Sequence, residues 1–134
     1  MTDLESLIAR VEAAEAGGRE LDAEIGFAID GWKTNLCPTV DELKYLVENN
    51  GLRIPPYTSD LNAALKLVEA KLPGWDWQVS SFGKRGSAKV YHLAGENFAN
   101  DGDDEDFAVT SDGATPALAI CAALLRALAD RGER

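Results

Sequence analysis

Basic residues are scarce in this chain, and one long stretch lacks them altogether. The 134 residues include 13 Lys and Arg against 23 Asp and Glu, for a formal net charge of −10. No Lys or Arg occurs between Lys89 and Arg126. Duplex nucleic acid is bound mainly by Lys and Arg that neutralise its phosphates, so we expect no duplex nucleic-acid partner. A small anion in a local basic pocket, or a basic protein partner, is compatible with this charge.

Long apolar runs and recognisable cofactor motifs are also missing. No run approaches the roughly 20 apolar residues that span a bilayer, and the N-terminus lacks the basic-then-apolar order of a signal peptide. We therefore expect a cytoplasmic protein without membrane attachment. Cys37 and Cys121 form no C-x-x-C pair, and no Walker, G-x-G-x-x-G or H-E-x-x-H motif is present. We expect neither a cofactor nor a metal.

Catalytic groups are equally scarce. His92 is the only histidine, and a triad would need a nucleophile and a carboxylate beside it, whereas no G-x-S-x-G elbow occurs. The acidic loop at residues 101–106 lacks the central glycine and distal glutamate of a calcium hand. We predict a packed histidine, a solvated loop and a protein that is not an enzyme.

Five helices are predicted from apolar residues at helical spacing and from capping residues. Thr2, Thr39 and Thr115 are expected N-caps, and Thr58 or Ser59 is expected to cap the fourth helix. The predicted helices cover residues 2–14, 19–29, 39–49, about 60–72 and 115–130.

The last helix has two different sides. Large aliphatic residues share one side, and Ala119, Ala123 and Ala127 share the other. A broad apolar side predicts burial against a sheet, whereas the alanine side permits close approach of a second layer or a partner subunit. This pattern predicts a homo-oligomer.

Three strands are predicted between the last two helices. Residues 75–82 and 87–94 alternate apolar and polar side chains around the loop 83–86, and residues 107–110 form a third strand before a turn at 111–113. Pairing Phe82 with Ser87 places Trp75, Trp77 and Val79 on the apolar face, together with Ala88 and Val90. The fold class is therefore α+β, with a small antiparallel sheet of about three strands flanked by helices in one domain, residues 1–134.

Four segments together resemble the phage ABA-sandwich domain proteins, a family encoded in phages and prophages. They are residues 20–25 (ELDAEI), 56–65 (PYTSDLNAAL), 74–77 (GWDW) and 114–119 (ATPALA). The resemblance implies an α/β/α sandwich, with helices on both faces of the sheet, and a bacterial host cell. It brings no established activity. Residues 26–54 depart from the family pattern and are interpreted as an insertion.

The predicted binding site lies on the hairpin. Lys84, Arg85 and Lys89 form a basic cluster beside Tyr91, and Gln78 and Ser80 share its face. Arginine can bind phosphate through two hydrogen bonds, and tyrosine can stack on a ring. The alternative interpretation is a charged hairpin tip that keeps the domain soluble.

These features favour a phage accessory protein that acts by binding. We expect a counter-defence module that sequesters a small anionic, nucleotide-like signal, held between helices and sheet or across a subunit interface. The alternative is an acidic protein-interaction or phage assembly factor without a small-molecule ligand.

Overall fold

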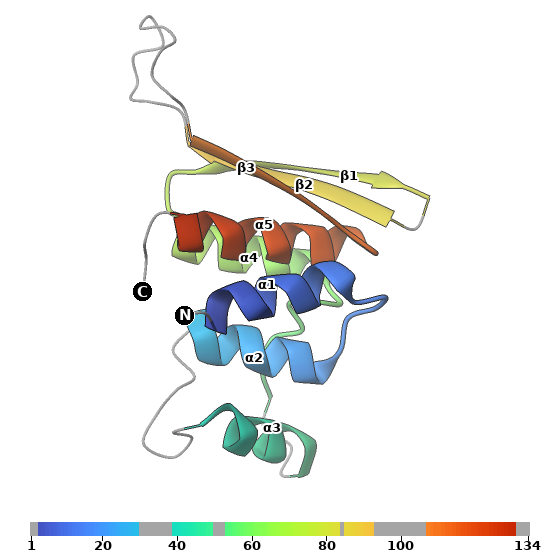
Figure 1. The fold of residues 1–134 in the computed structure, drawn as a ribbon, viewed down its shortest axis with the longest axis vertical. Helices are drawn as coiled ribbons and strands as arrows, with labels where there is room; N and C mark the ends of the chain where they lie inside the picture. Colours follow the sequence, from blue (N-terminus) through green and yellow to red (C-terminus); the bar gives the residue numbers. More distant parts are fainter. Residues whose placement is uncertain (1–2, 30–38, 50–52, 84, 93–106, 131–134) are drawn as a thin grey trace, which may run out of the picture.

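Five helices and three strands make up the computed structural model, which describes residues 3–29, 39–49, 53–83, 85–92 and 107–130. The α+β class and the small antiparallel sheet are confirmed, with strand order β1-β2-β3 (Figure 1). The expected cap Thr2 and the acidic loop 101–106 lie outside the described residues. The elements are α1 (Asp3–Ala13), α2 (Arg19–Ile29), α3 (Val40–Asn49), α4 (Leu61–Lys71), β1 (Asp76–Phe82), β2 (Arg85–His92), β3 (Phe107–Gly113) and α5 (Pro116–Asp130).

Helix α5 is the centre of the molecule. Residues 117–125, 127 and 128 are all buried, and Arg126 is the exposed exception among them. The sheet covers one side of α5, and α1 and α4 cover the other (Figure 1). A helix that is apolar all round is stable only when every side is covered, and here the chain supplies all of that cover.

This burial removes the reason for predicting a homo-oligomer. The side chains of Ala119, Ala123 and Ala127 are each 0% exposed, so the alanine side of α5 is already packed within the chain. The oligomeric state itself stays a prediction without that support.

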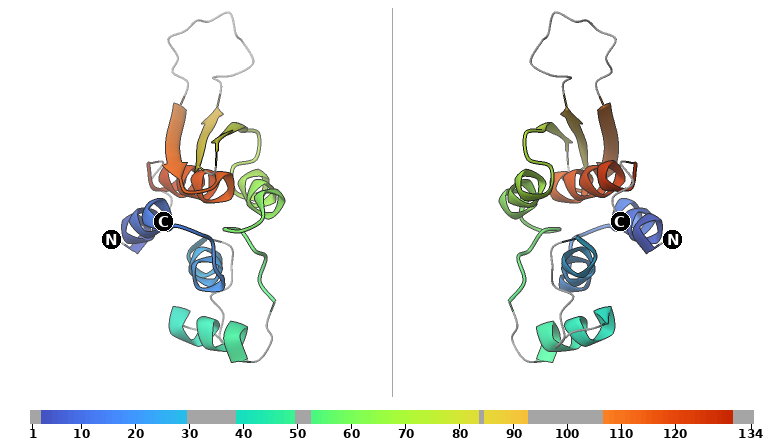
Figure 2. Two further views of the ribbon diagram at one scale, coloured as in Figure 1. Left: turned by 90° about the vertical axis from the view of Figure 1, so that its right-hand side faces the viewer. Right: turned by 90° about the vertical axis from the view of Figure 1, so that its left-hand side faces the viewer.

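The order of the layers differs from the expected α/β/α sandwich. All described helices lie on one face of the sheet, and the other face, called the outer face below, is open (Figure 2). Gln78 and Ser80 of β1 and Thr110 of β3 are exposed there. A sheet face with polar side chains needs no helical cover. The second helical layer, α1 and α4, packs on α5 and not on the sheet's outer face.

The β1–β2 hairpin is tighter than predicted. Phe82 pairs with Arg85 rather than with Ser87, and Gly83, with a φ of 66°, opens a two-residue connection. Glycine favours such a turn because it adopts positive φ without a steric penalty. The register is shifted by two residues, so each side chain keeps its predicted face. Ala88 and Val90 are buried as expected.

Trp77 is less buried than the apolar pattern predicts. It is 37% exposed, while Trp75 and Val79 are partly buried. Helix α5 packs mainly under β2 and β3, so the inner side of β1 extends past its cover.

Two expected helix starts are confirmed and one is wrong. The hydroxyls of Thr39 and Thr115 accept hydrogen bonds from the backbone of α3 and α5, at 3.2 Å in each case. Helix α4 is capped by Asp60, whose side chain accepts from the amide of Asn62 at 2.9 Å. Thr58 cannot act as that cap because its hydroxyl is bound to α2.

Strand β3 is longer than predicted. The expected turn at residues 111–113 is extended and pairs with β2 as far as Gly86 opposite Gly113. On the inner face of the sheet, the hydroxyl of Ser111 donates a hydrogen bond of 3.3 Å to the carboxylate of Glu12. The same carboxylate accepts two hydrogen bonds from Arg126, of 2.6 and 2.9 Å. These bonds connect β3, α1 and α5.

Helix α3 lies at the end of the molecule farthest from the sheet and packs against α2 (Figure 1). Leu43 is its buried residue, and Tyr45 is 61% exposed. The interpretation of residues 26–54 as an insertion stays a prediction, and residues 30–38 and 50–52 of that range lie outside the described residues. None of the helices that the structure describes is long and apolar enough to cross a membrane.

Replacing Gly86 should reveal how closely α5 approaches the sheet. A Cβ atom at Gly86 would lie 2.5 Å from the backbone of Pro116, so Gly86→Ala should lower the free energy of unfolding by about 3 kcal/mol. Ser81→Ala is the control, because Ser81 pairs with Gly86 but is exposed. Urea denaturation measures both variants. Equal stability would contradict the close approach.

Candidate functional site

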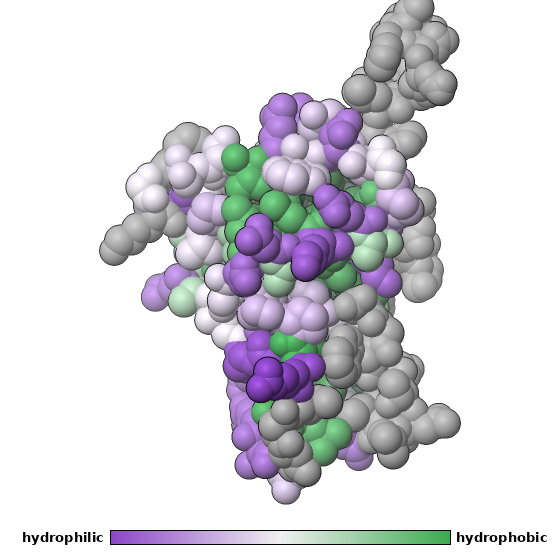
Figure 3. Space-filling model, turned by 180° about the vertical axis from the view of Figure 1, so that it is seen from behind, coloured by the Kyte–Doolittle hydropathy of each residue, from purple (hydrophilic) through white to green (hydrophobic). Residues whose placement is uncertain are grey.

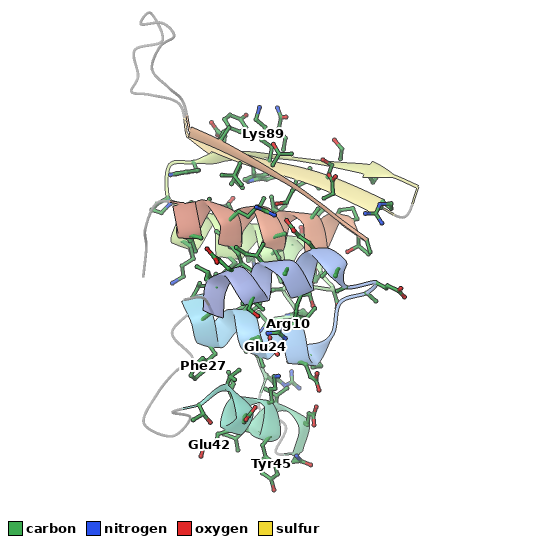
Figure 4. All side chains as sticks on the ribbon, viewed as in Figure 1. Arg10, Glu24, Phe27, Glu42, Tyr45 and Lys89 are labelled. Atoms are coloured by element: carbon green, nitrogen blue, oxygen red, sulfur yellow. The ribbon has the colours of Figure 1, made fainter. Side chains whose placement is uncertain are left out.

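The outer face of the sheet brings together most of the predicted site residues. On the central strand β2, Lys89 lies between Gln78 of β1 and Thr110 of β3, and Ser87 lies opposite Ser80. Figure 4 shows Lys89 pointing away from the helices. Because alternate residues of neighbouring strands share a face, these polar side chains form one continuous surface.

Lys89 and Tyr91 interact directly. The Nζ atom of Lys89 lies 5.2 Å from the centre of the Tyr91 ring, within the range of a cation–π contact. Both side chains are partly exposed. The contact holds a positive charge and an aromatic ring side by side on open surface.

The charge of this face is mixed rather than basic. Arg85 is exposed at the hairpin end of β2, but Asp76 lies opposite Tyr91 and Asp112 opposite Ser87. Lys84, the third predicted cation, lies outside the described residues. The alternation along the hairpin already predicted Asp76 on this face. Asp112 was not expected there, because it belongs to a part of β3 that was expected to be a turn.

The N-terminal part of α5 lies very close to the sheet at two glycines. Cβ atoms added at Gly86 and Gly113 would lie within 3 Å of the α5 backbone or of the residue before it. A ligand between helices and sheet therefore cannot lie at these two glycines, and its expected position there or across a subunit interface stays a prediction.

A buried polar cluster that the sequence did not reveal connects α2 to the segment before α4. Asp22 is 0% exposed and accepts hydrogen bonds from the backbone amide of Thr58 at 2.8 Å and from its hydroxyl at 2.7 Å. Arg19 donates to Asp22 at 3.0 Å and to the carbonyl of Ile54 at 2.7 Å. Both carboxylate oxygens have partners, so this cluster is structural.

A sequence signal for this cluster did exist. Asp22 interrupts the buried side of α2 between Leu21 and Ile25, and a buried carboxylate requires hydrogen-bond donors. The sequence does not identify the donor, because Thr58 is 36 residues away.

A second charged cluster joins three helices. Glu24 of α2 forms ion pairs with Arg10 of α1 and with Lys44 of α3, the latter at 2.5 Å. Figure 4 shows Arg10 and Glu24 at the junction of their helices. Burial alone would raise the pKa of Glu24, but hydrogen bonds from Arg10 and Lys44 outweigh it and hold the pKa below the ordinary value of 4.5.

Cys121 is the remaining candidate for chemistry whose surroundings the structure describes. Cys121 is buried and donates a weak hydrogen bond to the carbonyl of Tyr57 at 3.3 Å. Burial, with the nearby charge of Asp22, raises the pKa of the Cys121 thiol, so it is not a thiolate at neutral pH. Within the described ranges, no three His, Cys, Asp or Glu side chains are grouped to hold a metal ion. The side chain of His92 lies outside the described part.

The chain matches no protein-family model, no curated protein and no solved structure.

The charge of Glu24 should make the packing of α3 depend on pH. A carboxylate with a lowered folded pKa stabilises the fold above its unfolded pKa and loses this effect as the pH falls through the folded value. Glu24→Gln should therefore lower the free energy of unfolding by about 1–2 kcal/mol at neutral pH.

The difference in free energy of unfolding between the unchanged protein and Glu24→Gln should shrink as the pH falls below 4.5, the ordinary pKa of this carboxyl. Thermal denaturation from pH 7 to pH 3 measures it, with the exposed Glu42→Gln on α3 as control. A deficit that stays constant over this range would contradict the ionised pair.

Proposed function

We propose that the protein binds a ligand rather than catalysing a reaction, and that the outer face of the sheet is its binding surface. The observation that supports this is the Lys89–Tyr91 contact on an open face that also presents Arg85, Gln78 and Ser80. A cation and an exposed aromatic ring side by side suit an anion that carries a planar ring.

A nucleotide-like ligand has both chemical parts. Its ring would stack near Tyr91, its phosphate would lie toward Lys89 and Arg85, and Gln78 and Ser80 would orient it through hydrogen bonds. Asp76 and Asp112 repel further negative charge, so a monophosphate suits this face better than a polyphosphate does.

For the biological role the proposal relies on the four sequence segments that resemble phage ABA-sandwich proteins, although the described helices lie on one face of the sheet only. In this proposal a phage or prophage makes the protein in the cytoplasm of its bacterial host, and the protein sequesters a small anionic signal of a defence system. Sequestration requires binding without turnover, which agrees with the lack of a recognisable catalytic motif in the sequence.

Calorimetry against cyclic and linear nucleotides tests the proposal. At least one should bind in the micromolar range, and Lys89→Met should weaken it about tenfold or more because the cation is lost. Lys66→Met is the matched control, since Lys66 is exposed on α4 away from the outer face. If no nucleotide binds to the folded protein, the proposal is wrong.

A second candidate is an acidic interaction or assembly factor. It is favoured by exposed carboxylates on the first three helices and on the segment between α1 and α2, which are Glu5, Glu15, Glu20, Asp41, Glu42 and Glu48. Such a surface attracts a basic protein.

Affinity capture from infected cells should then return one partner whose retention falls as salt rises, because salt screens exposed charges. Retention that is independent of salt would count against this function.

A further inference from the structure

The side of the molecule at β1 has an uncovered edge. Among the described residues β1 has β2 as its neighbour on one side and no strand on the other. Helix α4 lies beside α5 on this same side (Figure 2). The free edge of β1 and the adjacent flank of α4 together form a surface that we call the ledge.

Apolar side chains line the ledge. Trp77 is 37% exposed on the inner side of β1, and Val79, Leu61 and Leu65 are partly buried. The opposite flank of α4, with Ala63 and Leu67, borders a separate depression of about 350 Å³ beside residues 55–57. By helical spacing, Leu61 and Leu65 lie on the flank of α4 away from this depression. Figure 3 shows hydrophobic atoms exposed on this side of the molecule.

The β1 edge has few of the features that usually protect a free strand. Charged side chains and prolines are common safeguards of edge strands, but the sequence DWQVSSF contains no Lys and no Pro, and its one charged residue, Asp76, is the first residue of the strand. The other edge strand, β3, has α1 beside it, and Ser111 is bonded to Glu12 there. The free hydrogen-bonding groups of β1 are thus the more available of the two.

We propose that an extended segment of another protein binds to the ledge and pairs with β1 as a fourth strand. Side chains at alternate positions of that segment would pack on Trp77, Val79 and Leu65, so they should be apolar. The side chains between them would lie on the outer side near Asp76. Because the chain carries a net charge of −10, those positions suit Lys or Arg.

A second copy of this chain does not fit the same edge. In a two-fold pair the two β1 strands would lie about 4.8 Å apart, and both copies of α4 would fall beneath their junction. Packed helices need axes about 8–10 Å apart, so the two α4 helices would collide. The charge of −10 on each copy adds repulsion. A single strand over α4 meets neither obstacle.

A synthetic peptide of seven residues that alternates valine and lysine, matched to the length of β1, is the probe. The full chain should bind it at least about tenfold more tightly than a peptide that alternates valine and glutamate. N-methylation of alternate backbone amides should abolish binding, because the added strand would lose its hydrogen bonds to β1. Calorimetry measures all three peptides.

Hydrogen exchange locates the bound peptide without any substitution. Amides of β1 that point away from β2 should exchange more slowly when the valine–lysine peptide is bound, while the edge amides of β3 stay unchanged. Failure of this peptide to bind would overturn the proposal, as would protection elsewhere with none in β1. Equal binding of the valine–glutamate peptide would contradict the proposal that the partner segment is basic.

Trp77→Ser should weaken the valine–lysine peptide about tenfold. Tyr45→Ser is the matched control, because Tyr45 is an exposed aromatic residue at the far end of the molecule (Figure 4). Unchanged affinity of folded Trp77→Ser would exclude packing on the ledge. If that variant does not fold, the hydrogen-exchange result on the unchanged chain decides the question.

Discussion

The burial of α5, with Arg126 as its exposed residue, is the constraint on which the rest of the structure depends. Its two charged residues are Arg126 and Asp130, so water cannot solvate any broad side of it. The sheet, α1 and α4 each cover part of its surface. Glycines at positions 86 and 113 allow the helix backbone to approach the sheet closely. The polar outer face is possible because the core lies around this helix and not around the sheet.

The sequence predicted the parts of the fold that local patterns determine. The bounds of α2 and α5, the caps Thr39 and Thr115 and the faces of both hairpin strands were correct because spacing and capping are local properties. Helix α5 showed the limit of this reasoning. Its alanines permitted either a second layer or a partner subunit, and only the position of α1 and α4 in space shows which of these covers them.

The candidate site was predicted in part for the same reason. Alternation along β2 placed Lys89 and Tyr91 together correctly, whereas Asp112 was missed because β3 was expected to end before it. The bond between Asp22 and Thr58 joins residues 36 positions apart. A pattern within one helix can indicate that a buried carboxylate needs a donor, but it cannot identify a donor from a distant segment.

Alternate residues of strand β2 face opposite sides of the sheet, so packing limits the size of one set of side chains and not of the other. Gly86, Ala88 and Val90 are buried on the inner face of the sheet, and at Gly86 even an added Cβ atom would meet the backbone of Pro116 in α5. Ser87, Lys89 and Tyr91 face the other way and contribute little to that packing. Evolution can therefore change the chemistry of the outer surface one residue at a time while the fold stays intact, so related chains with this fold need not share a ligand.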